Sequence, residues 1–383
     1  MPFDFNKKLD RINNHSMKYN VFSKELLPMW VADMDFESPD CVKQALIQRL
    51  QQGDLGYTKA WPELNESIVS WCKARYDWEI QAHWIAWLPG IVSGFNMACS
   101  GFNKGKVVVQ TPNYPPMLQA PKLSGQVSSE LFVTFNANTQ RWMFDFNQLE
   151  TFLSDETCGL FLLCNPMNPH GTMLSENEIK KIIQLCKQYN VQLCSDEIHC
   201  DLAFEKQHIP AGKFDPTAIT LMAASKTFNI AGLGCSFAII QDTKIRKIFT
   251  NQMKGLVSWP SSLGLEATFS AFQDGEPWRI ALIKQLKVNR DLLVNSLNKM
   301  TINNKVIFKT HLNDASFLCW IDCNHLESLT KQTAIEWFKT AGIMPSNGVD
   351  FGAQSFVRIN YGCPEFTILN AIDKIKIHLL KFN

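Results

Sequence analysis

The chain has 383 residues, which at roughly 150 residues per domain suggests two or three folding units. Hydrophobic residues make up 46% and charged residues 19%, a composition that excludes disordered, collagen-like and low-complexity proteins. Lys and Arg total 37 against 36 Asp and Glu, and no charge run is long enough to form a basic face. We therefore expect a small-molecule ligand, with neither nucleic acid nor membrane as a partner.

The twelve cysteines indicate the cellular compartment. They are scattered, contain no CxxC pair, and several fall in apolar runs such as 160–164 and 191–194. Disulfide frameworks are typical of short secreted chains, so we expect buried thiols, no cysteine-bound metal and a cytoplasmic location. Residues 1–20 carry charges throughout, and no 18 consecutive residues are apolar, so neither an export signal nor a membrane span is expected.

The first two thirds of the chain alternate helical and strand patterns. A helix is expected from Ser38-Pro39 to Gly53, and a second over 62–76. A capping box at Ser175 and Glu178 opens a helix that extends to Tyr189. Buried strands are expected at 107–110, 159–164, 191–195, 219–223 and 237–240. This alternation predicts an α/β domain with a mainly parallel sheet.

The pattern changes after Pro260. A long helix is expected over 277–300. It is followed by two expected strands at 306–309 and 317–321 and a helix at 333–340. An extended stretch at 356–360 and a closing helix at 365–380 complete the pattern. These segments predict a smaller α+β domain. We assign residues 50–285 to the large domain and residues 1–49 with 286–383 to the small one.

Polar segments follow several predicted strands. In open α/β sheets, ligands bind beyond the carboxyl ends of the strands. Lys226 directly follows such a strand, and desolvation there would lower its pKa and leave an amine able to form a Schiff base. Taken alone, a solvated loop lysine is the commoner interpretation of this pattern.

Two further features are compatible with binding of a cation and of an anion. Asp196 directly follows the strand at 191–195 and needs a cation to be buried, which a protonated ring nitrogen would supply. A helix N-cap or a structural ion pair explains it equally well. Segment 89–94 precedes a helix whose first free amides would hold an anion, although it contains neither a Walker motif nor GxGxxG.

Four motifs, taken in order, carry a family resemblance. They are Asn168-Pro-x-Gly, Asp196-Glu-Ile-His199, Ser225-Lys226-Thr-Phe-Asn and Val357-Arg358-Ile-Asn360. Together they resemble the aminotransferase class I/II superfamily, the fold-type I enzymes that use pyridoxal 5′-phosphate. The segment Pro28-Met-Trp-Val-Ala-Asp-Met-Asp-Phe36, and His199 in place of a tyrosine, are similar to the cystathionine β-lyase type of carbon–sulfur lyases. The resemblance implies a large domain with a seven-stranded sheet.

The resemblance also implies residue roles. Lys226 would bind the cofactor covalently and move the Cα proton, and Asp196 would keep the pyridine nitrogen protonated. Asn168 would form a hydrogen bond with O3′ of the cofactor, and Tyr114 would stack on its ring. The phosphate would be bound by Ile91, Val92, Ser225 and, from a second subunit, Tyr57. Arg358 would contact the carboxylate of the substrate. Tyr57 alone would equally be a packing aromatic, Tyr114 a loop tyrosine and Arg358 a strand-edge surface charge.

His199 has two open interpretations, a core histidine bonded to backbone and a group that tunes O3′ of the cofactor. The chain also departs from the wider superfamily at Ala223, where many members have a hydroxyl, and at Gly234, where an arginine is frequent. Phosphate binding would then depend more on amides and on the second subunit.

The resemblance implies a cytoplasmic homodimer with shared active sites that cleaves cysteine S-conjugates to pyruvate, ammonia and a thiol. An aminotransferase of the same fold is the alternative, because it would use the same cofactor residues. A non-catalytic regulator is disfavoured, since such a protein has no chemical need for Lys226, Asp196 and Arg358 together.

Overall fold

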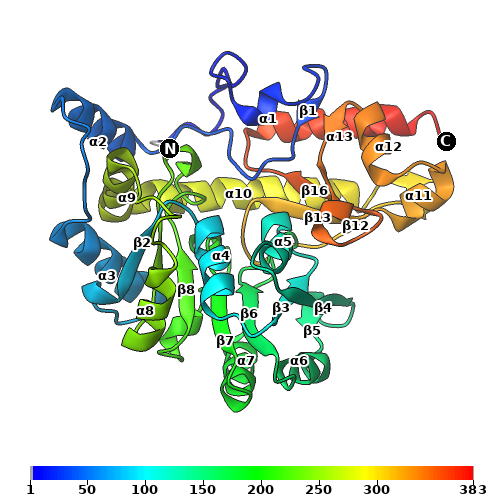
Figure 1. The fold of residues 1–383 in the computed structure, drawn as a ribbon. Helices are drawn as coiled ribbons and strands as arrows, with labels where there is room; N and C mark the ends of the chain where they lie inside the picture. The colour runs from blue at the N-terminus through cyan, green and yellow to red at the C-terminus, as the bar shows by residue number, and fades with distance from the viewer. Residues whose placement is uncertain (1–2, 383) are drawn as a thin grey trace. The chain divides into compact units, whose positions relative to one another are not determined.

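The computed structural model describes residues 3–382, which group into two compact units (Figure 1). Unit 1 contains residues 3–37, 169–171 and 280–382, and unit 2 contains residues 38–168 and 172–279. Residues 38–49, expected in the smaller domain, group with unit 2, and residues 280–285, expected in the larger domain, group with unit 1.

Unit 2 is built on an eight-stranded sheet. In sheet order its strands are β2 (Ile85–Leu88), β9 (Ser236–Ile239), β8 (Ile219–Met222), β7 (Gln192–Asp196), β6 (Cys158–Cys164), β3 (Lys106–Thr111), β4 (Val127–Asn136) and β5 (Arg141–Phe144). Neighbours from β8 to β4 are parallel, whereas β9 and β5 run antiparallel to the strands beside them. The predicted α/β fold is confirmed, with eight strands where the resemblance implied seven.

The five expected strands of this sheet correspond to β3, β6, β7, β8 and β9, each within one residue of the expected limits. The hairpin of β4 and β5 was not expected. Only two of the ten β4 residues, Leu131 and Val133, are buried, so the strand lacks the continuous apolar run that marks its neighbours.

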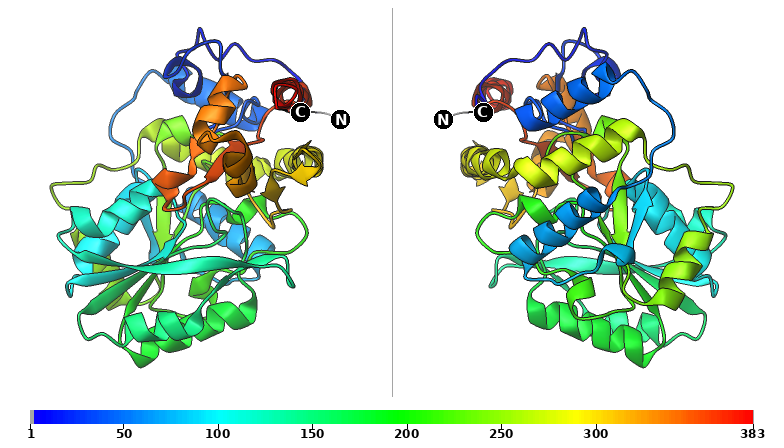
Figure 2. Two further views of the ribbon diagram at one scale, coloured as in Figure 1. Left: turned by 90° about the vertical axis from the view of Figure 1, so that its right-hand side faces the viewer. Right: turned by 90° about the vertical axis from the view of Figure 1, so that its left-hand side faces the viewer.

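Helices cover both faces of this sheet (Figure 2). Successive strand residues point to opposite faces, so Val107 and Val109 pack in one core cluster and Val108 in another. The helices of unit 2 are α2 (Asp40–Gln51), α3 (Pro62–Tyr76), α4 (Ile91–Gly101), α5 (Pro115–Leu123), α6 (Phe146–Leu153), α7 (Glu176–Gln188), α8 (Thr243–Asn251) and α9 (Ser262–Asp274). The clusters place α4, α5 and α8 on one face and α6 and α7 on the other.

Local capping signals explain several helix limits. The predicted capping box is present at α7, where the Ser175 hydroxyl accepts from the Glu178 backbone and the Glu178 carboxylate accepts from Ser175 N. Helix α3 has the predicted limits, with Pro62 in its first turn. Helix α2 begins at Asp40 and has Pro39 at its N-cap, so the expected capping by Ser38 was wrong by one position.

Unit 1 contains a four-stranded antiparallel sheet in the order β12 (Lys309–Thr310), β13 (Leu318–Asp322), β16 (Phe356–Asn360) and β15 (Ser346–Asn347). A second strand pair joins β1 (Leu27–Pro28) to β14 (Ile343–Met344), and a third joins β10 (Thr301–Ile302) to β11 (Lys305–Val306). Its helices are α1 (Met17–Asn20), most of α10 (Glu276–Leu297), α11 (Asn324–Thr330), α12 (Ala334–Thr340) and α13 (Glu365–Leu379). This mixture of helices and antiparallel strands agrees with the expected α+β character.

The structure also shows the environment of the cysteines and the length of the described helices. All twelve thiols are free and eleven are buried, while Cys41 is half-buried, so the expectation of buried thiols holds for all but one. Within residues 3–382, no helix is both long enough and apolar enough to cross a bilayer.

Candidate active site

The polar segments predicted after strands lie at one edge of the unit 2 sheet. Strands β6, β7 and β8 are adjacent and parallel, and their register sets Cys164 opposite Asp196 and Asp196 opposite Leu221. Asn165 N donates to the Asp196 carbonyl at 2.9 Å, and Glu197 N donates to the Leu221 carbonyl at 2.9 Å. The three chain segments that leave these strands therefore begin side by side.

Asp196 is the buried acid of this edge. One of its carboxylate oxygens accepts a hydrogen bond from Ile198 N at 3.1 Å. Burial raises the pKa of Asp196 to about 7; the Ile198 hydrogen bond and the charge of Lys226 oppose the rise, and the charge of Glu197 adds to it. Such a carboxylate is poised between its two protonation states, and a cation placed against it would hold it ionised. This fits the protonated ring nitrogen that the sequence predicts as its partner.

Lys226 lies in the turn that follows β8. Phe228 N donates to the Ala224 carbonyl at 2.9 Å and Ile230 N donates to the Ser225 carbonyl at 3.0 Å, so the backbone around the lysine is fixed. Its side chain is half-buried, and its positive charge lowers the pKa of Asp196. Lys226 therefore lies near enough for its charge to act on Asp196, and it is less exposed than a solvated loop lysine would be.

The start of α4 follows β2 at the same edge of the sheet and has free backbone amides. Gly90 is the N-cap, and the first helical amides, including those of Ile91 and Val92, have no carbonyl partner within the helix. Ile91 is buried and Val92 is exposed. At Gly94, a Cβ atom would come within 2.9 Å of the Leu221 side chain, so glycine lets the helix pack closely on β8. The arrangement fits a phosphate group.

Three further predicted residues follow strands or begin helices of unit 2. Tyr114 is the N-cap of α5, its N donates to Asn113 Oδ1 at 2.7 Å, and its half-buried ring packs on the core cluster that contains Ile91. Asn168 follows β6 and is buried, and His199 follows β7 and is buried. Burial of His199 agrees with both interpretations of this residue.

Tyr57 differs from the other predicted residues because its side chain is fully exposed. It lies in the segment between α2 and α3, where the neighbouring Leu55 is also exposed. A packing aromatic within its own chain would be covered, so that interpretation is wrong for the described chain.

Arg358 lies in unit 1 on β16, an inner strand of the four-stranded sheet. It is 5% exposed, so the strand-edge surface charge interpretation is wrong. Its Nη2 donates to the Trp30 carbonyl at 2.8 Å and to Ser346 Oγ at 3.1 Å. Its guanidinium carbon lies 4.6 Å from the ring centroid of Phe351. These contacts hold the planar fork of the guanidinium in one orientation, as carboxylate recognition requires.

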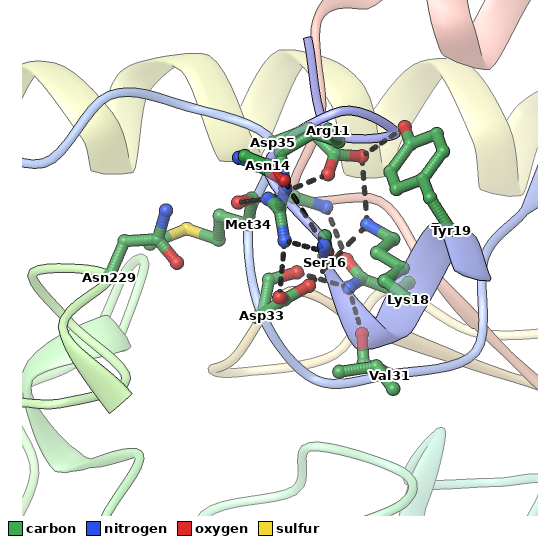
Figure 3. A network of polar contacts seen from close by, with 12 residues as sticks. Arg11, Asn14, Ser16, Lys18, Tyr19, Val31, Asp33, Met34, Asp35 and Asn229 are labelled. Carbon is green, nitrogen blue, oxygen red and sulfur yellow. Dashed lines mark hydrogen bonds and ion pairs between the residues drawn. The ribbon is translucent and has the colours of Figure 1, made fainter. Parts of the chain in front are cut away.

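A partly buried ion-pair network is formed around Asp33 and Asp35, a few residues after the Trp30 that Arg358 contacts (Figure 3). Lys18, 1% exposed, donates to Asp35 Oδ2 at 2.8 Å. Arg11 donates to Asp33 at 2.5 Å and to Asp35 at 3.0 Å, and the Tyr19 hydroxyl donates to Asp35 at 3.1 Å. The sequence shows no sign of these ion pairs, because the cationic partners of the two aspartates come from a separate stretch of the chain.

A second polar cluster that the motifs did not single out lies directly behind Asp196. Glu197 is fully buried and accepts hydrogen bonds from Ser195 Oγ at 2.8 Å and Ala211 N at 2.9 Å. A ring nitrogen of the buried His208 lies 2.7 Å from its second oxygen. The only signal in the sequence was the second carboxylate at the strand end, which shows no partner until the chain is folded.

Comparisons with known proteins agree with this geometry. The profile of the family described as aminotransferase class I and II matches residues 24–375. The chain is 31% identical to cystathionine beta-lyase PatB of Bacillus subtilis, over 98% of this chain and 100% of that protein. Among solved structures, it is similar to OvoB (36% identity, TM-score 0.92, 98% of this chain and 99% of that one). It is also similar to the PLP-bound C-S lyase from Staphylococcus hominis (30% identity, TM-score 0.91, 99% of each chain). The chain therefore belongs to the aminotransferase class I and II family.

Proposed function

We propose that this protein is a pyridoxal 5′-phosphate-dependent carbon–sulfur β-lyase of the cystathionine β-lyase type, with a small amino acid as substrate. The observation that carries the proposal is the buried carboxylate of Asp196 at the end of β7, which is paired with β8, the strand that leads into the turn of Lys226. The names of two relatives, a cystathionine beta-lyase and a PLP-bound C-S lyase, support the reaction and the cofactor.

The residues at this edge of the unit 2 sheet would contact different parts of the cofactor. Asp196 would pair with the ring nitrogen, and Lys226 would hold the aldehyde end. The remaining contacts are ring stacking by Tyr114, an O3′ hydrogen bond from Asn168, a neighbouring position for His199, and phosphate binding by Ser225 and the amides of Ile91 and Val92. Bound pyridoxal 5′-phosphate supplies an electron sink that stabilises negative charge at the substrate Cα.

Two side chains of the protein, those of Arg358 and Lys226, act on the substrate. Arg358 binds the α-carboxylate through its fixed guanidinium and orients the Cα–H bond. The amine of Lys226, once free, removes the Cα proton. A sulfur substituent at Cβ leaves as a thiolate, and water hydrolyses the remaining three-carbon enamine to pyruvate and ammonia.

The assembly and location follow as parts of the same proposal. The functional unit is a homodimer in which Tyr57, exposed in the single chain, reaches the phosphate site of the second copy. Unit 2 is the core of the large cofactor domain and unit 1 that of the small domain, and the enzyme works in the cytoplasm. The scattered free thiols are compatible with a reducing compartment.

One assay tests the reaction. The purified holoenzyme is incubated with L-cystathionine, with and without 2-oxoglutarate, and pyruvate and glutamate are measured. We expect pyruvate, ammonia and thiol in equal amounts without any oxo acid. Turnover that requires 2-oxoglutarate and produces glutamate would reject the lyase and favour the aminotransferase.

A further inference from the structure

The segment that follows β7 connects Asp196 to Asp201 through a closed turn. Ile198 N donates a hydrogen bond to Asp196 Oδ1 at 3.1 Å, and Cys200 N donates to the Glu197 carbonyl at 3.0 Å. The backbone amide that binds the Asp196 carboxylate therefore belongs to a turn that leads directly to Asp201. A displacement of Asp201 would reach this hydrogen bond across only three residues of chain.

Asp201 is held in place by side chains from two other parts of unit 2. It is 2% exposed. Its Oδ1 accepts a hydrogen bond from Trp71 Nε1 at 3.0 Å and another from the Tyr76 hydroxyl, and both donors lie on α3. Its backbone carbonyl accepts from Arg279 Nη1 at 3.0 Å. Because a buried polar atom without a partner is costly, these bonds fix the position of Asp201.

Trp71 also contacts the segment that follows β8. Its ring packs on that of Phe228, with centroids 6.0 Å apart and planes at 64°. Phe228 N donates to the Ala224 carbonyl at 2.9 Å and so closes the turn that contains Lys226. Phe272 packs on both rings, at 5.1 Å from Trp71 and 6.2 Å from Phe228. The same indole therefore contacts both segments, one through its N–H and the other through its ring.

The relative position of these two segments matters for the proposed reaction. Asp196 would pair with the ring nitrogen of the cofactor and Lys226 would hold its aldehyde end, so the two side chains must be spaced to fit a rigid aromatic ring. A misplacement of about 1 Å at a reacting centre can lower a rate by about 100-fold. A residue that fixes both segments would therefore affect catalysis without touching the substrate.

We propose that Trp71, together with Asp201, sets the position of the Asp196 segment relative to the Lys226 turn and thereby the orientation of the bound cofactor. Both are positioning residues, because they act through the two segments and not on the substrate. This inference rests on the proposed function, which assigns the two ends of the cofactor to Asp196 and Lys226.

The test compares the holoenzymes of the wild type, Trp71→Phe, Asp201→Ala and Asp201→Asn. Visible circular dichroism reports the orientation of the bound cofactor, and alkaline release gives the cofactor content, so that the signal is expressed per bound cofactor. Values of kcat and KM with L-cystathionine are measured on the same samples. Urea denaturation reports any loss of stability.

Trp71→Phe retains an aromatic ring but removes the N–H donor to Asp201. The dichroism per cofactor should change and kcat per cofactor should fall about tenfold, the scale of one lost buried hydrogen bond. KM should stay within about twofold, because Arg358 is unaltered and uniform substrate binding is kept. Asp201→Ala should have the same effects. Asp201→Asn keeps an acceptor oxygen for both donors, so its spectrum should match the wild type and its kcat should stay within about twofold.

Trp87 provides the matched control. Like Trp71 it is 7% exposed, and its Nε1 donates to Asn65 Oδ1 on α3 at 3.1 Å. Trp87→Phe removes the same donor and the same volume, but its bond goes to α3 and not to the segment of Asp201. It should leave the dichroism and kcat unchanged, even where it lowers the urea midpoint.

Two results would overturn the inference while leaving the lyase intact. One is a wild-type spectrum and kcat in Trp71→Phe, and the other is a loss in Asp201→Asn as large as that in Asp201→Ala. If Trp71→Phe does not fold, Tyr76→Phe takes its place, because it removes the other donor to Asp201 Oδ1, and the same result is expected. Wild-type protein that binds no cofactor would instead reject the proposed function.

Discussion

Nη2 of Arg358 donates a hydrogen bond to the backbone carbonyl of Trp30 at 2.8 Å, although the two residues are 328 positions apart in the chain. Ser346 Oγ donates to the same carbonyl at 2.8 Å. Arg358, the residue proposed to bind the substrate carboxylate, is therefore held by segment 28–36, whose sequence resembles that of the cystathionine β-lyase type.

Arg358→Ala should weaken transition-state binding by roughly 2 to 5 kcal/mol, the usual scale for removing one partner of a desolvated charge pair. The measurement is kcat/KM with L-cystathionine. Arg246 is a suitable control, because its guanidinium also donates to a backbone carbonyl, that of Ile240 at 2.7 Å, but lies on α8. Arg246→Ala should retain the wild-type rate. An unchanged rate in Arg358→Ala would mean that another group binds the carboxylate.

Lys226→Ala should abolish covalent cofactor attachment and nearly all turnover, because the proposed chemistry needs an amine at this position. Borohydride reduction of the wild-type holoenzyme followed by peptide mapping should find the label on Lys226. Lys180, which is exposed and pairs with Glu176 on α7, provides the control, and Lys180→Ala should retain both label and activity. A label on any other lysine would contradict the assignment.

Lys18→Met should lower the free energy of unfolding by about 3 to 5 kcal/mol, because it leaves two buried or partly buried carboxylates with one cation fewer. Urea denaturation followed by circular dichroism measures the effect. Lys7, in an exposed pair with Glu37 at 2.6 Å, is the matched control, and Lys7→Ala should change stability by about 0.5 kcal/mol or less. Equal effects of the two substitutions would show that the network in Figure 3 contributes little.

Tyr57→Ala should leave the stability of the folded chain within about 0.5 kcal/mol of wild type, since the side chain packs on nothing in its own chain. Cofactor retention should nevertheless decrease if the tyrosine binds phosphate in the second copy. Sedimentation across a dilution series, with cofactor absorbance recorded in the same run, follows both properties. A fully active wild-type monomer that keeps its cofactor would contradict the shared site.

Much of the cofactor-binding unit was predictable because its signals are local. The apolar run at 159–164 is buried on both faces of the sheet, and such a run identifies a central strand without knowledge of its neighbours. The capping box at Ser175 and Glu178 is likewise complete within four residues. Asp196 and Lys226 could be singled out because both lie at the carboxyl end of such a strand, Asp196 as the last residue of β7 and Lys226 in the turn after β8. The fold and the family inferred from these motifs are confirmed.

The tertiary structure alone decided which distant groups share an environment. Nothing near Glu197 in the sequence indicates that His208, eleven residues later, lies 2.7 Å from its carboxylate, or that Ala211 N donates to it. The pairing of Lys18 with Asp35 and of Arg358 with Trp30 likewise depends on which separate segments of the chain the fold brings together. Periodicity and capping act over a few residues, whereas a buried charge is stabilised by whichever partner the complete fold places against it.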